Sequence, residues 1–190
     1  MRGTEWQTRT IPGTIQTRDE ETPVIEGHFA VFERETELFP GVFETIDRGA
    51  FAETLGDDIR ALINHDTTLV LGRNRSDTLE LSVDETGLFG RIQINPADTD
   101  AMNLYHRVQR GDVTQCSFGF DILDEDSEYR EDGTAHFRVK KVRLYEVSPC
   151  TFPAYADTGV QARMAQAEQM KERALEAWRK KQKERMKQWH

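Results

Sequence analysis

The sequence predicts a mixed α+β protein, mainly β, in which a closed or nearly closed β-barrel is surrounded by helices and followed by a helical tail. Several segments between residues 24 and 149 are rich in β-branched and aromatic residues and end at turn formers. Only two helical segments interrupt these strands. Several strands with few helices indicate a closed or nearly closed β-barrel. From Val160 to His190 the chain consists mainly of helix formers and has no Gly or Pro.

Alternation of apolar and polar residues indicates where the strands lie in the sequence. The expected strands span residues 24–33, 58–66, 78–95, 113–123 and 135–149. Turn-forming residues at Asp84 to Gly87 and at Glu131 to Gly133 predict two hairpins.

Two helices are expected within the body and one after it. The first, residues 49–55, is short; the second spans residues 97–112, with Asp98 or Thr99 as N-cap and Gly111 as the stop. The tail is predicted to form one helix whose apolar spacing is loose and gives way to charge beyond Trp178. Such a helix is either solvated or a partner-binding or removable appendage.

The length of 190 residues fits one domain with a peripheral tail. We expect an N-terminal extension over residues 1–23, the barrel domain over 24–158 and the tail over 159–190. No segment reaches the roughly 18 consecutive apolar residues of a membrane helix, and the first residues lack the apolar run of a signal peptide. We therefore expect no membrane partner and a cytoplasmic location.

Charge is unevenly distributed along the chain. Residues 160–190 carry nine Lys or Arg against four Glu, a net charge of +5, so the whole-chain charge of −9 leaves −14 for residues 1–159. Binding of nucleic acid requires clustered basic residues, which makes the acidic body a poor candidate for it. We expect no nucleic-acid partner.

The only cysteines are Cys116 and Cys150. They are too few for a disulfide framework, although a single bridge stays possible, and neither belongs to a zinc-type Cys-x-x-Cys pair. We expect a reducing compartment, no metal and no cofactor.

The stretch QCSFGFDI, residues 115–122, contains a candidate nucleophile. It is not the Gly-x-Ser-x-Gly elbow of the α/β-hydrolases, because Gln115 stands where the first glycine would be. Strand alternation predicts an apolar face made of Cys116, Phe118, Phe120 and Ile122. Cys116 is therefore expected in the core, and Ser117 on the opposite face, where nucleophilic work is possible.

A serine nucleophile needs a base and the base needs an acceptor that orients it. His65 is the preferred base because it ends the strand ALINHD, where a rigid scaffold opens into a loop. Of the other histidines, His28, His106 and His190 lie in poorer contexts, and His136 is a weaker competitor.

Glu146 is the candidate acceptor. It lies in the otherwise apolar strand VRLYEVSPCTF, and alternation places it on the face of Val142 and Leu144. A carboxylate there should have a partner, since burial of an unpaired charge is costly. The alternative to a catalytic histidine is a salt bridge with Arg143 or Arg91.

These segments together resemble the prohead (capsid maturation) proteases of tailed bacteriophages. The resemblance rests on ALINHD, LGR, LELSVDETGLFGRIQI, a helix ending in GDV, QCSFGFDI and VRLYEVSPCTFPAY in this order, and covers roughly residues 24–157. That family is regarded as related to the herpesvirus assemblins, serine proteases on a helix-surrounded β-barrel. Carried over motif by motif, the resemblance implies a catalytic triad of His65, Ser117 and Glu146.

The resemblance also implies a function. Ser117 would attack a peptide carbonyl and His65 would shuttle the proton. The oxyanion would be stabilised by a backbone N–H near Ser117, or by water or the guanidinium of Arg73 in LGRNR. The implied substrates are the scaffold segment of the major capsid protein and the protease itself, inside the viral prohead in the host cytoplasm. A homodimer is plausible by analogy with the assemblins.

Two other classes remain open. The Asp-Thr-Gly triplet at Asp157 is found in aspartic proteases, but Pro153 and Tyr155 precede it where an apolar strand is required, so Asp157 or Thr158 fits better as an N-cap. The other class is a non-catalytic module that binds capsid or scaffold protein and keeps the barrel without the chemistry.

Overall fold

The computed structural model describes residues 7–11, 15–18, 22–152 and 157–187. The strands are β1 Gln7–Ile11, β2 Gln16–Arg18, β3 Val24–Val31, β4 Thr36–Phe39, β5 Val42–Ile46, β6 Arg60–Ile63, β7 Asp66–Arg73, β8 Leu79–Val83, β9 Gly87–Gln93, β10 Gln115–Tyr129 and β11 Ala135–Cys150. A 3-10 turn, η1, covers Asn74–Ser76, and the helices are α1 Thr99–Arg110 and α2 Asp157–Lys187.

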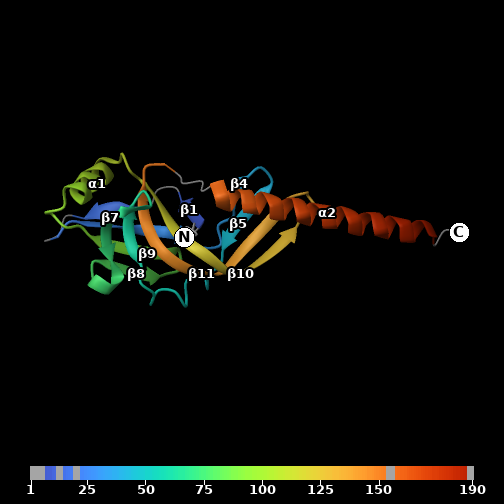
Figure 1. The fold of residues 1–190 in the computed structure, drawn as a ribbon, viewed down its shortest axis with the longest axis horizontal. Helices are drawn as coiled ribbons and strands as arrows, with labels where there is room; N and C mark the ends of the chain where they lie inside the picture. Colours follow the sequence, from blue (N-terminus) through green and yellow to red (C-terminus); the bar gives the residue numbers. More distant parts are fainter. Residues whose placement is uncertain (1–6, 12–14, 19–21, 153–156, 188–190) are drawn as a thin grey trace.

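The described strands form two sheets. The larger has seven strands in the order β1-β10-β11-β5-β4, with β6 paired to β11 and β7 paired to β6; the smaller has the order β2-β3-β9-β8. Both sheets end in strands that pair on one side only, so the expected closed barrel is not confirmed. The mixed α+β class is confirmed, with far more strand than helix (Figure 1).

The largest core cluster joins side chains from both sheets and from α1. Phe118 and Phe120 stack with ring centroids 4.7 Å apart, and Phe51 meets Phe118 edge-on at 5.5 Å. Cys116 is fully buried in the same cluster, as the alternation of QCSFGFDI predicted. The apolar face of β10 is therefore a core face, and it fixes where the polar residues between these positions can point.

The helix expected over residues 49–55 is wrong. This segment forms successive turns, in which Ala52 donates its N–H to the carbonyl of Gly49 and Thr54 donates its own to Phe51. Phe51 is fully buried, and the Thr54 hydroxyl accepts a hydrogen bond from the Leu144 N–H on β11. Anchoring to the core thus overrides the weak helical preference of a short segment.

α1 was predicted correctly from its caps. The Asp98 side chain accepts hydrogen bonds from the N–H groups of Asp100 and Ala101, and Gly111 ends the helix in the left-handed conformation. The hairpin turn at Asp84 to Gly87 is also confirmed, because it joins β8 to β9 with a hydrogen bond from the Asp84 N–H to the Gly87 carbonyl.

α2 continues well beyond the strands, which makes the molecule elongated (Figure 1). Its early turns contact the body: Arg163 binds Glu44 and Glu125, and Ala167 and Met170 pack on a small cluster around Phe137. Leu175 and Trp178, farther along, are 44% and 60% exposed. The tail is therefore a single helix, as expected, and much of it lies in solvent. The side chain of Asp157, expected as a cap, lies outside the described residues.

Candidate active site

His65 lies in the two-residue turn between β6 and β7. Ile63 pairs with Asp66, and the two residues between them, Asn64 and His65, both have positive φ angles of 51° and 64°. Positive φ at both central positions is the geometry of a type I′ hairpin, which matches the natural twist of the strands. The turn therefore determines the direction in which the imidazole leaves the backbone.

The turn is held against the end of β11. The Asn64 N–H donates to the Pro149 carbonyl at 3.1 Å, and the Asn64 side chain accepts from the Thr151 N–H at 2.8 Å. The His65 N–H donates to the Ser148 hydroxyl at 3.3 Å. Three hydrogen bonds thus fix the backbone of a residue that is otherwise on a hairpin tip.

The structure brings His65 and Glu146 together. His65 Nδ1 lies 2.6 Å from Glu146 Oε1, and the Ser148 hydroxyl donates to the other carboxylate oxygen. Glu146 is 2% exposed, so its charge is compensated by these contacts rather than by water. Both arginines considered from the sequence have other partners: Arg91 pairs with Glu26 in the other sheet, and Arg143 hydrogen-bonds Tyr145.

A β-bulge places Glu146 on the side of β11 that faces away from the phenylalanines. Glu146 pairs with Gly119, Leu144 pairs with Phe120, and the register shifts between these pairs. Directly opposed residues share a face, so Leu144 lies on the core face of Phe120 whereas Glu146 lies on the face of Ser117. The expectation that Glu146 shares the face of Leu144 is therefore wrong.

Ser117 lies one strand farther from His65. It pairs with Ser148 across the β10–β11 ladder, and both serines are fully buried. β11 pairs with β10 on one side and with β6 on the other, so β11 lies between the strand that carries Ser117 and the strand that leads into the His65 turn. The hydroxyl of Ser117 donates to the backbone carbonyl of Arg9 on β1 at 2.7 Å.

Cys150 contacts the other nitrogen of the imidazole. Its Sγ lies 3.7 Å from His65 Nε2, and the thiol also donates to the Ser148 carbonyl at 3.4 Å. Burial, helped by the nearby Glu146 charge, raises the pKa of the Cys150 thiol to about 12. The thiol is therefore protonated at neutral pH and is poorly suited to be a nucleophile.

Arg73 is bound to Asp58. Its Nε and Nη2 lie 2.7 Å from the two carboxylate oxygens of Asp58, and this pairing lowers the pKa of Asp58 to about 2. Asp58 and Glu146 both line a groove of about 280 Å³ beside β6. An oxyanion role for Arg73 stays a prediction.

The other described histidines lie elsewhere, and the ring of His106 on α1 meets that of Tyr105 edge-on. His28 lies 2.7 Å from Asp84, and His136 lies 2.8 Å from the Thr45 hydroxyl. His190 lies outside the described residues. Within the described ranges no group of three or more His, Cys, Asp or Glu side chains is arranged to hold a metal ion.

Sequence reasoning did not anticipate three groups around the site, namely Asn64, Ser148 and Cys150. The alternation of EVSPC does contain a signal, because it places Ser148 and Cys150 on the same side of the strand as Glu146. For Asn64 the sequence indicates only that this residue type tolerates the left-handed conformation of a turn, and not that its side chain binds the end of β11.

Comparisons with known proteins place most of this chain in one family. Residues 12–173 match the family described as Caudovirus prohead serine protease. The chain belongs to this family. Over 150 residues it is 31% identical to the prohead protease of Enterobacteria phage HK97, and the alignment covers 77% of this chain. The resemblance stated from the motifs is thereby confirmed.

The matched segment of this family member includes His65, Ser117 and Glu146. The chain spans 62% of the length of the HK97 relative. No solved structure matches the chain. None of the described helices is long and apolar enough to cross a membrane.

Proposed function

We propose that the chain is a serine endopeptidase that acts in the maturation of a phage prohead. The observation that carries this proposal is the 2.6 Å contact between His65 Nδ1 and Glu146 Oε1 in a chain of the prohead serine protease family. The carboxylate fixes the tautomer with the proton on Nδ1, which leaves the Nε2 lone pair to act as a base.

In the proposed reaction Ser117 Oγ attacks the carbonyl carbon of a peptide bond. His65 Nε2 takes the hydroxyl proton and gives it to the leaving amine as the C–N bond breaks. Water then hydrolyses the ester on Ser117, again with His65 as base, and restores the serine. Arg73 is retained as a candidate for binding the developing oxyanion, with the condition that it must first leave Asp58.

The proposed substrate is the scaffold segment of a major capsid protein, cleaved inside the prohead, and the chain itself is a second proposed substrate. The many Lys and Arg residues of α2 support a role for this helix in binding the scaffold. The same basic residues offer sites for self-cleavage. A homodimer belongs to the same proposal.

A non-catalytic capsid-binding module is the second candidate. The observation that favours it is the buried state of Ser117, whose hydroxyl is engaged by the Arg9 carbonyl. The two candidates differ in whether Ser117 can be uncovered and react.

Fluorophosphonate labelling combined with cleavage of a capsid substrate tests the proposal. We expect labelling of the wild-type chain and of Ser127→Ala, which changes another serine of β10, but not of Ser117→Ala. His65→Ala should remove both labelling and cleavage. The proposal fails if the folded wild-type chain is not labelled by the probe and does not cleave capsid protein, whether or not scaffold protein is added. The capsid-binding module would then be the better-supported function.

A further inference from the structure

β1 covers Ser117. It pairs antiparallel with β10, and Thr10 lies opposite Ser117 in the ladder. β1 ends the order of the larger sheet and no other described strand pairs with its outer side. β1 is an edge strand of only five residues and pairs with one other strand, so another extended peptide could take its place by strand addition.

The residue whose carbonyl meets Ser117 is also anchored by its side chain. Arg9 Nε and Nη2 lie 2.5 Å and 2.8 Å from the two oxygens of Glu44 on β5. Glu44 is 3% exposed, and the Arg9 guanidinium also lies over the ring of Phe120 at 5.5 Å. Two parallel bonds to a carboxylate, together with an aromatic face, form a site suited to an arginine side chain.

We propose that β1 occupies the binding site of the substrate strand and that Glu44 selects a substrate with a basic side chain, arginine in preference to lysine, at the place of Arg9. This rests on the proposed peptidase function, because it places the carbonyl of the selected residue next to the nucleophile. Glu44 would then determine specificity for the residue on the amino side of the cut.

In this arrangement the contact between Ser117 and Arg9 keeps the hydroxyl from attacking β1. The Ser117 proton points to the Arg9 carbonyl oxygen, so it is not directed to the base. His65 Nε2 meanwhile contacts Cys150 rather than Ser117. A substrate strand that adds with a slightly different backbone position would release the hydroxyl toward His65.

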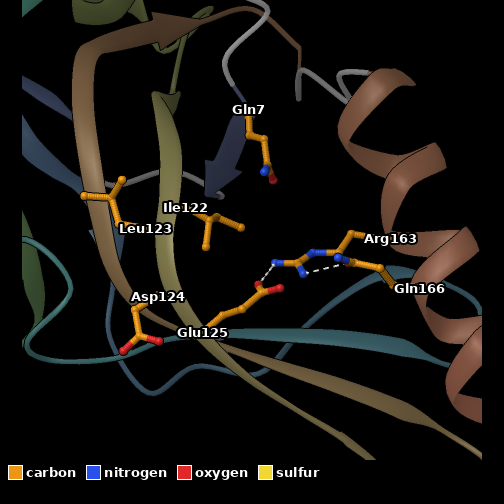
Figure 2. A pocket seen from close by; sticks show the side chains of 7 residues that line it. All are labelled: Gln7, Ile122, Leu123, Asp124, Glu125, Arg163 and Gln166. Atoms are coloured by element: carbon orange, nitrogen blue, oxygen red, sulfur yellow. Dashed lines mark hydrogen bonds and ion pairs between the residues drawn. The ribbon is translucent and has the colours of Figure 1, made fainter.

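A pocket lies next to Gln7, at the amino end of the proposed strand site. A pocket of about 370 Å³ is lined by Gln7 of β1, residues 122–125 of β10, and Arg163 and Gln166 of α2. Figure 2 shows Arg163 reaching from α2 to Glu125 next to this pocket, with Gln7 on its other side. Because β1 runs antiparallel to β10, a substrate longer than β1 would place residues on the amino side of Gln7 here.

Peptide binding tests the site without catalysis. The full chain with Arg9→Gln would be titrated into fluorescein-labelled QTRTI, the sequence of β1, and into QTQTI. We expect QTRTI to bind at least about tenfold more tightly, as a desolvated bidentate pair should give. Adding Glu44→Gln should remove this difference. Glu128→Gln, which deletes an exposed acid of β10 that pairs with Arg130, should keep it.

Equal binding of the two peptides, no binding of either, or the same loss with Glu128→Gln would overturn the assignment. Thermal unfolding and far-UV circular dichroism of each variant establish that it is folded before titration. A second measurement uses kcat/KM for capsid-derived peptides with Arg or Gln before the cut, where Glu44→Gln should lower the Arg-to-Gln ratio about tenfold or more.

The outcomes separate this inference from the peptidase proposal. Selective peptide binding without labelling of Ser117 would keep the strand site and discard the peptidase. Labelling and cleavage that are indifferent to Glu44 and to arginine would keep the peptidase and discard the role of Glu44.

Discussion

The imidazole of His65 and the carboxylate of Glu146 form a 2.6 Å contact between a hairpin turn and the strand it leans on. The residues come from positions 81 apart in the sequence, and Ser148 adds a second hydrogen bond to the same carboxylate. The pair is therefore built by strand pairing between β6 and β11 rather than by any local motif.

Glu146→Gln should lower kcat by about a thousandfold to ten thousandfold. The amide keeps the shape, but it can donate to Nδ1 and so favours the tautomer with the proton on Nε2, which is no longer a base. Steady-state cleavage of a capsid substrate measures the effect. Ser148→Ala should have a milder effect, because it removes the bond to the second oxygen and the acceptor of the His65 N–H but keeps the carboxylate. A kcat within tenfold of wild type for Glu146→Gln would contradict the role of this carboxylate.

Asn64→Gly should lower kcat by about tenfold to a hundredfold with little change in stability. Glycine accepts the left-handed backbone but removes the acceptor for the Thr151 N–H, so the turn that carries His65 loses a clamp. Asn64→Asp keeps both the acceptor and the tolerance of positive φ and should remain near wild type. If both variants behave alike, the clamp does not position the histidine.

Cys150 should be inert toward iodoacetamide at pH 8. Raising its pKa from 9.0 to about 12 leaves about a thousandfold less thiolate than in an unperturbed cysteine, because each pKa unit is tenfold in thiolate. Cys150→Ala should also keep Ser117 labelling. Mass spectrometry of tryptic peptides follows the alkylation, and rapid modification accompanied by loss of labelling would point to a thiol nucleophile instead.

Arg163→Met should destabilise the protein by about 2–3 kcal/mol. Arg163 is 3% exposed, binds Glu44 and Glu125, and lies 4.1 Å over the ring of Phe137, so it attaches α2 to the body. In this variant Glu44 would still pair with Arg9, which limits the loss of stability. Urea unfolding measures the change, and Lys171→Met on an exposed part of the same helix should cost less than about 0.5 kcal/mol.

Glu44 should make stability depend on pH in the acid range. Its burial alone would raise the pKa, but the charges and hydrogen bonds of Arg9 and Arg163 outweigh burial and hold the pKa below its ordinary value of 4.5. A lowered folded pKa means that the stabilisation is fully present above pH 4.5 and is lost as the pH falls through the folded pKa.

Denaturation of the wild type and of Glu44→Gln from pH 6 to pH 3 checks this. We expect the difference in unfolding free energy between the two proteins to shrink as the pH falls below 4.5, because the glutamine does not titrate. A difference that stays constant over this range would show that Glu44 does not carry the linkage.

Local patterns predicted much of the fold. The caps of α1, the hairpin at Asp84 and the core face of β10 all depend on residues that lie close together in the chain, and each is confirmed. The segment 49–55 was misread because Phe51 and Thr54 are fixed by distant partners, and β1 was missed because its pairing with β10 spans about a hundred residues.

For the candidate site, the sequence by itself determined which residues could do the chemistry: a histidine at a turn, a serine on a polar strand face and a glutamate that needs a partner. Only the tertiary structure decided which of them meet. The bulge at Tyr145 puts Glu146 on the face of Ser117. The hydrogen bonds of the Asn64 turn hold His65 next to Glu146. β1 covers Ser117. These contacts depend on strand register across the whole chain, and register is set by long-range packing rather than by neighbouring residues.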